Sequence, residues 1–215
     1  MRTWIKICGT TCIEDALDSI AAGADALGFV FAESKRRVSA EQAAGIVDRL
    51  PEGVERIGVF RNHTVEHVAE VVERAKLSGV QLHGDETAAF ILALRERLSG
   101  AGRIRVIQTV LVNDDFERRW AEVSGYEHLI DFVLLDAGGG SGRTFVWAKA
   151  LTPALQSRKP LIVAGGLQAE NVGEAIHRFA PWGVDVVSGV EREPGRKDPV
   201  KLMAFVESVR RAEQS

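Results

Sequence analysis

The chain alternates eight times between a short apolar run and a longer amphipathic segment. A strand followed by a helix, repeated in this way, predicts a parallel sheet, because each helix returns the chain to the start of the next strand. The apolar runs that we expect to be strands are Trp4–Cys8, Ala26–Phe31, Arg56–Phe60, Gly79–His83, Ile104–Thr109, Phe132–Asp136, Leu161–Ala164 and Val184–Ser188. The amphipathic segments predict helices at Ile13–Ala22, Ala40–Leu50, Val65–Lys76, Thr87–Leu98, Asp114–Val123, Phe145–Gln156, Ala169–Phe179 and Pro199–Arg211.

Eight strand–helix units are the number that closes into a (β/α)8 TIM barrel, and 215 residues fit one such domain over residues 1–215. The competing architecture is an open doubly wound sheet. Its dinucleotide-binding version would carry Gly-x-Gly-x-x-Gly after the first strand. Here the first strand ends Cys8-Gly9-Thr10-Thr11, so the sequence favours the barrel.

Charge and cysteine content narrow the function classes. The net charge is −3 and no long basic run occurs, so we expect no nucleic-acid or membrane-surface partner. No apolar run approaches the roughly 18 residues of a membrane span, and residues 1–6 lack the apolar middle of a signal peptide. Two cysteines are too few for a disulfide framework, and a cytoplasmic setting is expected.

Two strand ends carry reactive side chains, and barrel active sites lie at the carboxyl ends of the strands. Cys8 is either a base or nucleophile once ionised, or a small buried hydrophobe. Asp136 is either a functional acid or a solvated loop residue, and the glycines that follow it argue against a helix cap. Cys12 is expected at the start of the first helix. A metal at Cys8 and Cys12 would lack further nearby ligands, so no metal site is predicted.

Lys6 bears on the ionisation of Cys8, because strand alternation places both side chains on the face that points into the barrel. A lysine charge about 7 Å away would favour the thiolate by roughly 2 kcal/mol at an effective dielectric constant near 20. That interaction would bring the pKa of the thiol, ordinarily about 8.5, near neutrality. Alternatively, an internal carboxylate neutralises Lys6.

The last two strand ends are rich in glycine. In barrel enzymes, phosphate often binds between the loops after strands seven and eight, where backbone N–H groups hold the anion. The sequence therefore predicts a phosphorylated ligand held by Gly165, Gly166, Ser188 and Gly189. The loop Gly138–Thr144 is no nucleotide P-loop, because no Gly-Lys-Ser/Thr follows. It is expected to be a mobile loop, with Thr144 capping the next helix, or a plain connector.

Arg36 and His83 each have two interpretations, one purely structural and one functional. Arg36 lies in a charged run just past the second strand, which is either a solvated loop or the source of a bidentate clamp on a ligand carboxylate. His83 alternates onto the inner face of the fourth strand together with Gln81. It is either a satisfied core histidine or a ligand contact.

These residues make the chain resemble the phosphoribosylanthranilate isomerases of tryptophan biosynthesis over nearly its whole length. The motifs that carry the resemblance follow one another in order, about one per barrel unit. They are Lys6-Ile7-Cys8-Gly9, Gly28-Phe29-Val30-Phe31 with Ser34-Lys35-Arg36, Gln81-Leu82-His83-Gly84, Leu135-Asp136 with Gly140-Ser141-Gly142-Arg143-Thr144-Phe145, Ala164-Gly165-Gly166-Leu167 with Asn171-Val172, and Asp185-Val186-Val187-Ser188-Gly189-Val190-Glu191 with Pro194-Gly195 and Lys197-Asp198.

The resemblance implies the Amadori rearrangement of N-(5′-phosphoribosyl)anthranilate to a 1-deoxyribulose 5-phosphate product. Asp136 matches the family's general acid, Cys8 its general base, and Arg36 the arginine that orients the anthranilate carboxylate. The resemblance implies no metal and no organic cofactor. The expected partner is the phosphorylated sugar-anthranilate substrate, with the chain as a monomer or a homodimer.

The chain departs from the family pattern at two positions, and three other functions compete with the one that the resemblance implies. Many members of the family carry Lys where this chain has Gln108, and Asp where it has Val146. Gln in place of Lys at position 108 would remove a positive charge near the site. One rival isomerase would also convert the histidine-pathway aminoaldose, although such barrels usually use two aspartates. An indole-3-glycerol phosphate synthase would need a catalytic lysine and acids at the strand ends. A non-catalytic phosphosugar-binding barrel is the third rival.

Overall fold

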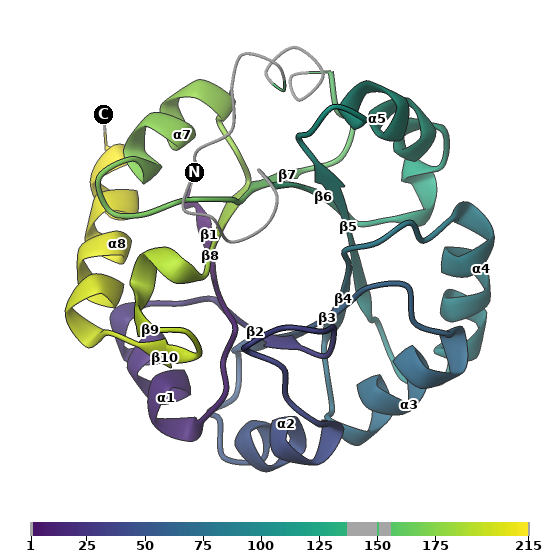
Figure 1. The fold of residues 1–215 in the computed structure, drawn as a ribbon, viewed down its shortest axis with the longest axis horizontal. Helices are drawn as coiled ribbons and strands as arrows, with labels where there is room; N and C mark the ends of the chain where they lie inside the picture. The colour runs from purple at the N-terminus through teal and green to yellow at the C-terminus, as the bar shows by residue number, and fades with distance from the viewer. Residues whose placement is uncertain (1, 137–149, 151–155, 215) are drawn as a thin grey trace.

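The structure is a computed structural model that describes residues 2–136, 150 and 156–214. Eight parallel strands form a closed ring in sequence order, and β1 pairs with β8 to complete it (Figure 1). The predicted barrel is therefore confirmed. The strands are β1 Trp4–Cys8, β2 Ala26–Val30, β3 Glu55–Phe60, β4 Gly79–Leu82, β5 Arg105–Leu111, β6 Phe132–Asp136, β7 Leu161–Val163 and β8 Gly183–Val186.

Helices surround the ring and cover its outer face (Figure 1). They are α1 Ile13–Ala22, α2 Ala40–Val47, α3 Val65–Arg74, α4 Ala88–Arg97, α5 Phe116–Gly125, α7 Val172–Phe179 and α8 Pro199–Ala212, with 3-10 turns η1 Glu127–Leu129 and η2 Ser188–Val190. The loop Gly138–Thr144 and Val146 lie outside the described residues, as does the predicted helix Phe145–Gln156 apart from two residues. Of these two, Ala150 is helical and buried, and Gln156 lies in a turn. Among the described helices, none combines the length and the apolar character that crossing a membrane requires.

Side-chain caps account for several helix starts. Ser39 and Gln42 form the complete capping box at α2, and the Thr64 hydroxyl accepts from the His67 N–H at α3, as the sequence predicts. Cys12 takes the N-cap position of α1 without a side-chain hydrogen bond. The caps at α2 and α3 satisfy N–H groups that a helix start otherwise leaves without a partner.

Two predicted boundaries near the site are wrong. The helix expected from Ala169 begins at Val172, because the Asn171 side chain organises a preceding turn by accepting from the Gln168 N–H and donating to the Gly166 carbonyl. The strand expected to run to Ser188 ends at Val186, and Ser188 starts the 3-10 turn η2. After that turn comes a short hairpin that the sequence did not predict, β9 Glu191–Glu193 with β10 Arg196–Lys197.

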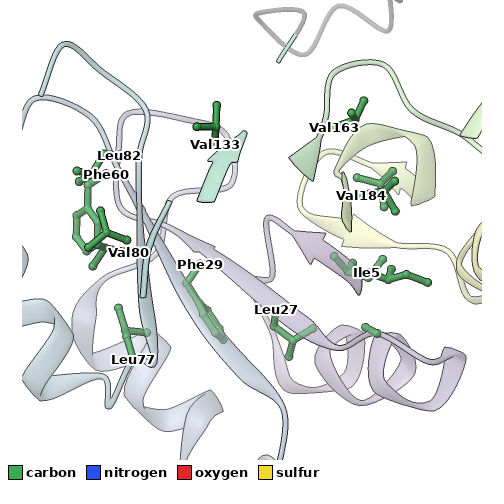
Figure 2. Packing of buried hydrophobic residues seen from close by; sticks show 14 of the residues in the cluster. Ile5, Leu27, Phe29, Phe60, Leu77, Val80, Leu82, Val133, Val163 and Val184 are labelled. Carbon is green, nitrogen blue, oxygen red and sulfur yellow. The ribbon is translucent and has the colours of Figure 1, made fainter. Parts of the chain in front are cut away.

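Apolar side chains form two buried layers. The larger lies between the sheet and the helices and includes Ile5, Leu27 and Phe29 from the outward-facing strand positions (Figure 2). The second fills the barrel interior with Trp4, Ala26, Ile57, Ile107, Phe132, Leu134, Ile162 and Ala164. Because successive strand residues face opposite sides, each strand supplies both layers, and the interior layer supports whatever lies above it at the carboxyl ends.

Candidate active site

A cavity of about 470 Å³ opens at the carboxyl ends of the strands. This volume suits a small-molecule ligand. Cys8, Arg36, His83, Asp136 and Ser188 all line it. The structure therefore brings together five of the eight residues that the sequence singled out.

Cys8 ends β1 with its side chain in the cavity wall and only 4% of its surface exposed. Gly28 on the neighbouring strand makes room for the thiol, since a Cβ there would lie 2.5 Å from the Cys8 Sγ. In the sequence, Gly28 stands out only as part of a family motif. Its pairing with Cys8 gives it a steric role that no local pattern reveals.

The expectation that Lys6 brings the pKa of Cys8 near neutrality is wrong. Burial of the thiol raises its pKa, and the opposing pull of the Lys6 ammonium does not offset this. Lys6 is fully buried, and its Nζ lies 2.9 Å from the Asp185 carboxylate on β8. The alternative of an internal carboxylate partner for Lys6 therefore holds, and Asp185 is that partner.

Asp136 ends β6 and faces His83, which directly follows β4. The Asp136 Oδ2 and the His83 Nε2 are 3.6 Å apart. Burial lowers the pKa of His83, although the nearby Asp136 carboxylate opposes the shift. The His83 imidazole is therefore neutral at pH 7, and on its other side the Nδ1 lies 3.3 Å from the Gln81 amide nitrogen. If that amide donates, the proton of His83 sits on Nε2, facing Asp136.

Arg36 lines the cavity and is held by Glu191. Its Nε and one Nη donate to the two Glu191 carboxylate oxygens at 2.8 and 2.6 Å. In the functional interpretation of its sequence, Arg36 binds a ligand carboxylate with two hydrogen bonds. One edge of the guanidinium instead makes such a bidentate contact with a carboxylate of the chain itself, Glu191. In the sequence, Glu191 and Lys197 stand out only as parts of the family motifs, without a role, because both belong to the unpredicted hairpin.

The glycine-rich loops after β7 and β8 lie against each other. Gly165 and Gly166 have φ values of 87° and 67°, a region that favours glycine. A Cβ on Gly189 would lie 2.0 Å from the Leu167 carbonyl oxygen, so only glycine permits this approach. Ser188 lines the cavity, whereas Gly165, Gly166 and Gly189 are not in its wall. The three glycines shape the loops beside the cavity.

Gln108, a departure from the family pattern, does not lie at the site. It is buried in the middle of β5, between Val106 and Val110 of the outer apolar layer, and its amide donates to the Leu82 and Thr109 carbonyls. The expectation that it changes the charge near the site is therefore wrong, because the side chain points to the helices. Among the described residues, no three His, Cys, Asp or Glu side chains form a group that could hold a metal ion.

The family model and the similar sequences give one family. The family model for N-(5′-phosphoribosyl)anthranilate isomerase matches residues 5–208. The N-(5′-phosphoribosyl)anthranilate isomerase of Geobacter sulfurreducens is 43% identical over 203 residues, covering 94% of this chain and 96% of the relative.

Solved structures of the same enzyme superpose closely. Monomers generated from the dimeric phosphoribosylanthranilate isomerase of Thermotoga maritima match with a TM-score of 0.84 and 39% identity, over 97% of this chain and 98% of that one. A phosphoribosylanthranilate isomerase in complex with reduced 1-(o-carboxyphenylamino)-1-deoxyribulose 5-phosphate matches with a TM-score of 0.83 and 39% identity over the same shares.

Proposed function

Because the chain belongs to the N-(5′-phosphoribosyl)anthranilate isomerase family, we propose that it carries out the Amadori rearrangement of this substrate with Asp136 as general acid and Cys8 as general base. The observation that carries the proposal is that these two side chains, from strands β1 and β6, line one cavity together with Arg36. An acid and a base of different chemical type suit a reaction in which each proton moves at a different atom.

The acid step opens the sugar ring. The protonated form of Asp136 donates its proton to the ribose ring oxygen, the bond from C1′ to that oxygen breaks, and the anilino nitrogen supplies electrons to form a protonated Schiff base. The neutral His83, 3.6 Å away, then faces the carboxylate that Asp136 has become. If the Gln81 amide donates to Nδ1, the imidazole proton is on Nε2 and supports the ionised acid after transfer.

The base step removes the proton from C2′. The raised pKa of the Cys8 thiol means that the free protein holds mainly the neutral form at pH 7. The positive charge of the Schiff base, next to C2′, favours the thiolate when the intermediate is present, because an opposite charge stabilises the ionised form. The thiol releases its own proton to solvent as the charged intermediate forms. The thiolate then takes the C2′ proton, and the resulting enolamine tautomerises to the ketone.

The two anionic ends of the substrate have separate binding groups in this proposal. Arg36 takes the anthranilate carboxylate, and the loops that contain Gly165, Gly166, Ser188 and Gly189 hold the phosphate. Close contact between the loops, seen at Gly189 and Leu167, supports one shared phosphate site. The free thiols of Cys8 and Cys12 fit a reducing cytoplasm. A homodimer, as in the Thermotoga maritima relative, and a monomer are both compatible with this site.

A turnover assay tests the proposal. Purified protein is mixed with freshly made N-(5′-phosphoribosyl)anthranilate, and the loss of substrate fluorescence is followed. We expect rapid loss that depends on protein concentration, and no conversion of the histidine-pathway aminoaldose, because the site offers one thiol where those barrels use a second aspartate. Absence of turnover by folded protein would overturn the proposed reaction.

A further inference from the structure

Glu191 gathers four hydrogen bonds on one buried carboxylate. Only 6% of the residue is exposed. Its oxygens accept from two nitrogens of Arg36, from the Gly195 N–H at 3.1 Å and from the Lys197 Nζ at 3.2 Å. Burial alone would raise its pKa, but Arg36 and Lys197 outweigh that effect and the pKa is lowered, so the group is ionised at pH 7. A charge buried this deeply needs such partners.

The Glu191 carboxylate binds Arg36 from outside the cavity. Arg36 lines the cavity, whereas Glu191 does not. Glu191 takes the edge of the guanidinium formed by Nε and one Nη, and the second Nη is bonded to no described residue. A guanidinium presents two edges that can each bind a carboxylate with a pair of N–H groups. The edge formed by the two Nη atoms is the one left for a ligand.

The Glu191 carboxylate is also connected, through Lys197, to β1, the strand that ends in Cys8. Lys197 is buried, and its Nζ donates to the Cys8 carbonyl at 2.5 Å as well as to Glu191. The stem of Arg36 crosses Gly9, where a Cβ would lie 2.6 Å from the Arg36 Cδ. Glu191 and Lys197 thus connect the arginine over the cavity to the main chain of the residue that ends β1.

We propose that Glu191 is a positioning residue for the family reaction. It holds the free edge of Arg36 toward the substrate carboxylate. Through Lys197, it also fixes the position of that edge relative to Cys8. The inference rests on the proposed role of Arg36. Neither Glu191 nor Lys197 touches substrate in this account, and their effect is on where the guanidinium stands.

Binding of two stable ligands tests the proposal without requiring turnover. The first is reduced 1-(o-carboxyphenylamino)-1-deoxyribulose 5-phosphate, and the second is the same compound without its carboxylate. Titration calorimetry compares wild type with Glu191→Gln, with Glu193→Gln as the matched control at an exposed position of the same strand, β9. We expect Glu191→Gln to weaken the carboxylate ligand at least tenfold and the other ligand less than twofold. Glu193→Gln should change neither.

Other outcomes are equally decisive. Equal weakening of both ligands would mean that Glu191 only supports the fold, and tighter binding of the carboxylate ligand would mean that Glu191 competes with it for Arg36. Either result overturns the inference. Should Glu191→Gln not fold, Glu191→Asp keeps the charge while shortening its reach, and the same selective loss is expected. If Arg36→Lys discriminates the two ligands but neither Glu191 variant does, this inference fails alone. If wild type does not discriminate them, the proposed role of Arg36 fails first.

Discussion

The two ends of the barrel interior differ in what they bury. At the amino ends of the strands, Trp4, Phe132 and Trp182 pack as an aromatic cluster, with ring centroids 4.3 to 5.0 Å apart, and the Arg105 guanidinium covers two of the rings. At the carboxyl ends, the interior holds the Lys6–Asp185 ion pair together with Cys8, His83 and Asp136. Apolar burial stabilises the first end, whereas a buried ion pair seldom repays its desolvation. The comparison indicates that the aromatic end contributes more to stability, and the charged end is where the proposed chemistry takes place.

The change from one end to the other takes two residues. In the pairing of β1 with β8, Trp4 lies beside Gly183 and Lys6 lies beside Asp185. A Cβ on Gly183 would lie 2.8 Å from the Trp4 ring, so glycine there makes room for the indole. One step further along the same face, an acid meets the lysine. The closing register of the barrel therefore decides both the aromatic packing and the ion pair.

The largest expected effect tests the chemical end. Asp136→Asn and Cys8→Ala should each lower kcat/KM by roughly 10²- to 10⁴-fold, which is the usual contribution of a positioned acid or base. Thermal melting should show both variants folded, because neither change opens a large cavity. Cys12→Ser, at the N-cap of α1, is the control and should keep nearly full activity. More than a tenth of the wild-type rate in either catalytic variant would refute its assigned role.

The next effect tests the aromatic end. Phe132→Ala should lower the free energy of unfolding by about 3 kcal/mol, because it removes a buried ring from the cluster. Urea unfolding measures this loss, and turnover per folded molecule should stay near that of wild type. Leu92→Ala, at a side chain 53% exposed on α4, should change stability by no more than about 0.5 kcal/mol. Loss of turnover in folded Phe132→Ala would show that the two ends are not separable.

Cys8 reactivity tests the electrostatics of the charged end. Because burial raises the pKa of the thiol above its ordinary value, the thiolate is the minor form at pH 7. In Cys12→Ser protein, the alkylation rate of Cys8 should therefore climb about tenfold per pH unit through neutral pH. Lys6→Met should move the profile to still higher pH, since the ammonium favours the thiolate. An alkylation midpoint below about pH 8.5, the ordinary pKa of a cysteine thiol, would contradict the direction of the shift.

The smallest effect distinguishes the two faces of the sheet. The Gln108 Oε1 is buried without a hydrogen-bond partner among the described residues. Gln108→Met should leave kcat/KM unchanged and keep the free energy of unfolding the same or raise it by up to about 1 kcal/mol. Gln81→Met, on the inner face against His83 and Thr109, is the matched substitution and should lower kcat/KM severalfold. If both substitutions changed kcat/KM equally, the side of the sheet that a glutamine faces would not matter for function.

Much of the fold and part of the site were predictable from local patterns. The alternation of apolar and amphipathic segments predicted the eight strands, and the positions where those strands end were enough to single out Cys8 and Asp136. Capping chemistry placed the starts of α2 and α3 because it acts within four residues. The start of α7 and the hairpin β9–β10 were missed, since the Asn171 turn and the Glu191 cluster depend on contacts that no local period encodes.

The sequence by itself determined the barrel, the strand ends at Cys8 and Asp136 and the glycines that allow close loops, because these follow from side-chain period and backbone freedom. Only the tertiary structure decided which charge meets which. Lys6 pairs with Asp185 across 179 residues and Arg36 with Glu191 across 155, and Gln108 faces the helices. The physical reason is closure of the ring. Which residues of β1 and β8 stand side by side depends on the register of the whole barrel, and that register is not written in any one segment.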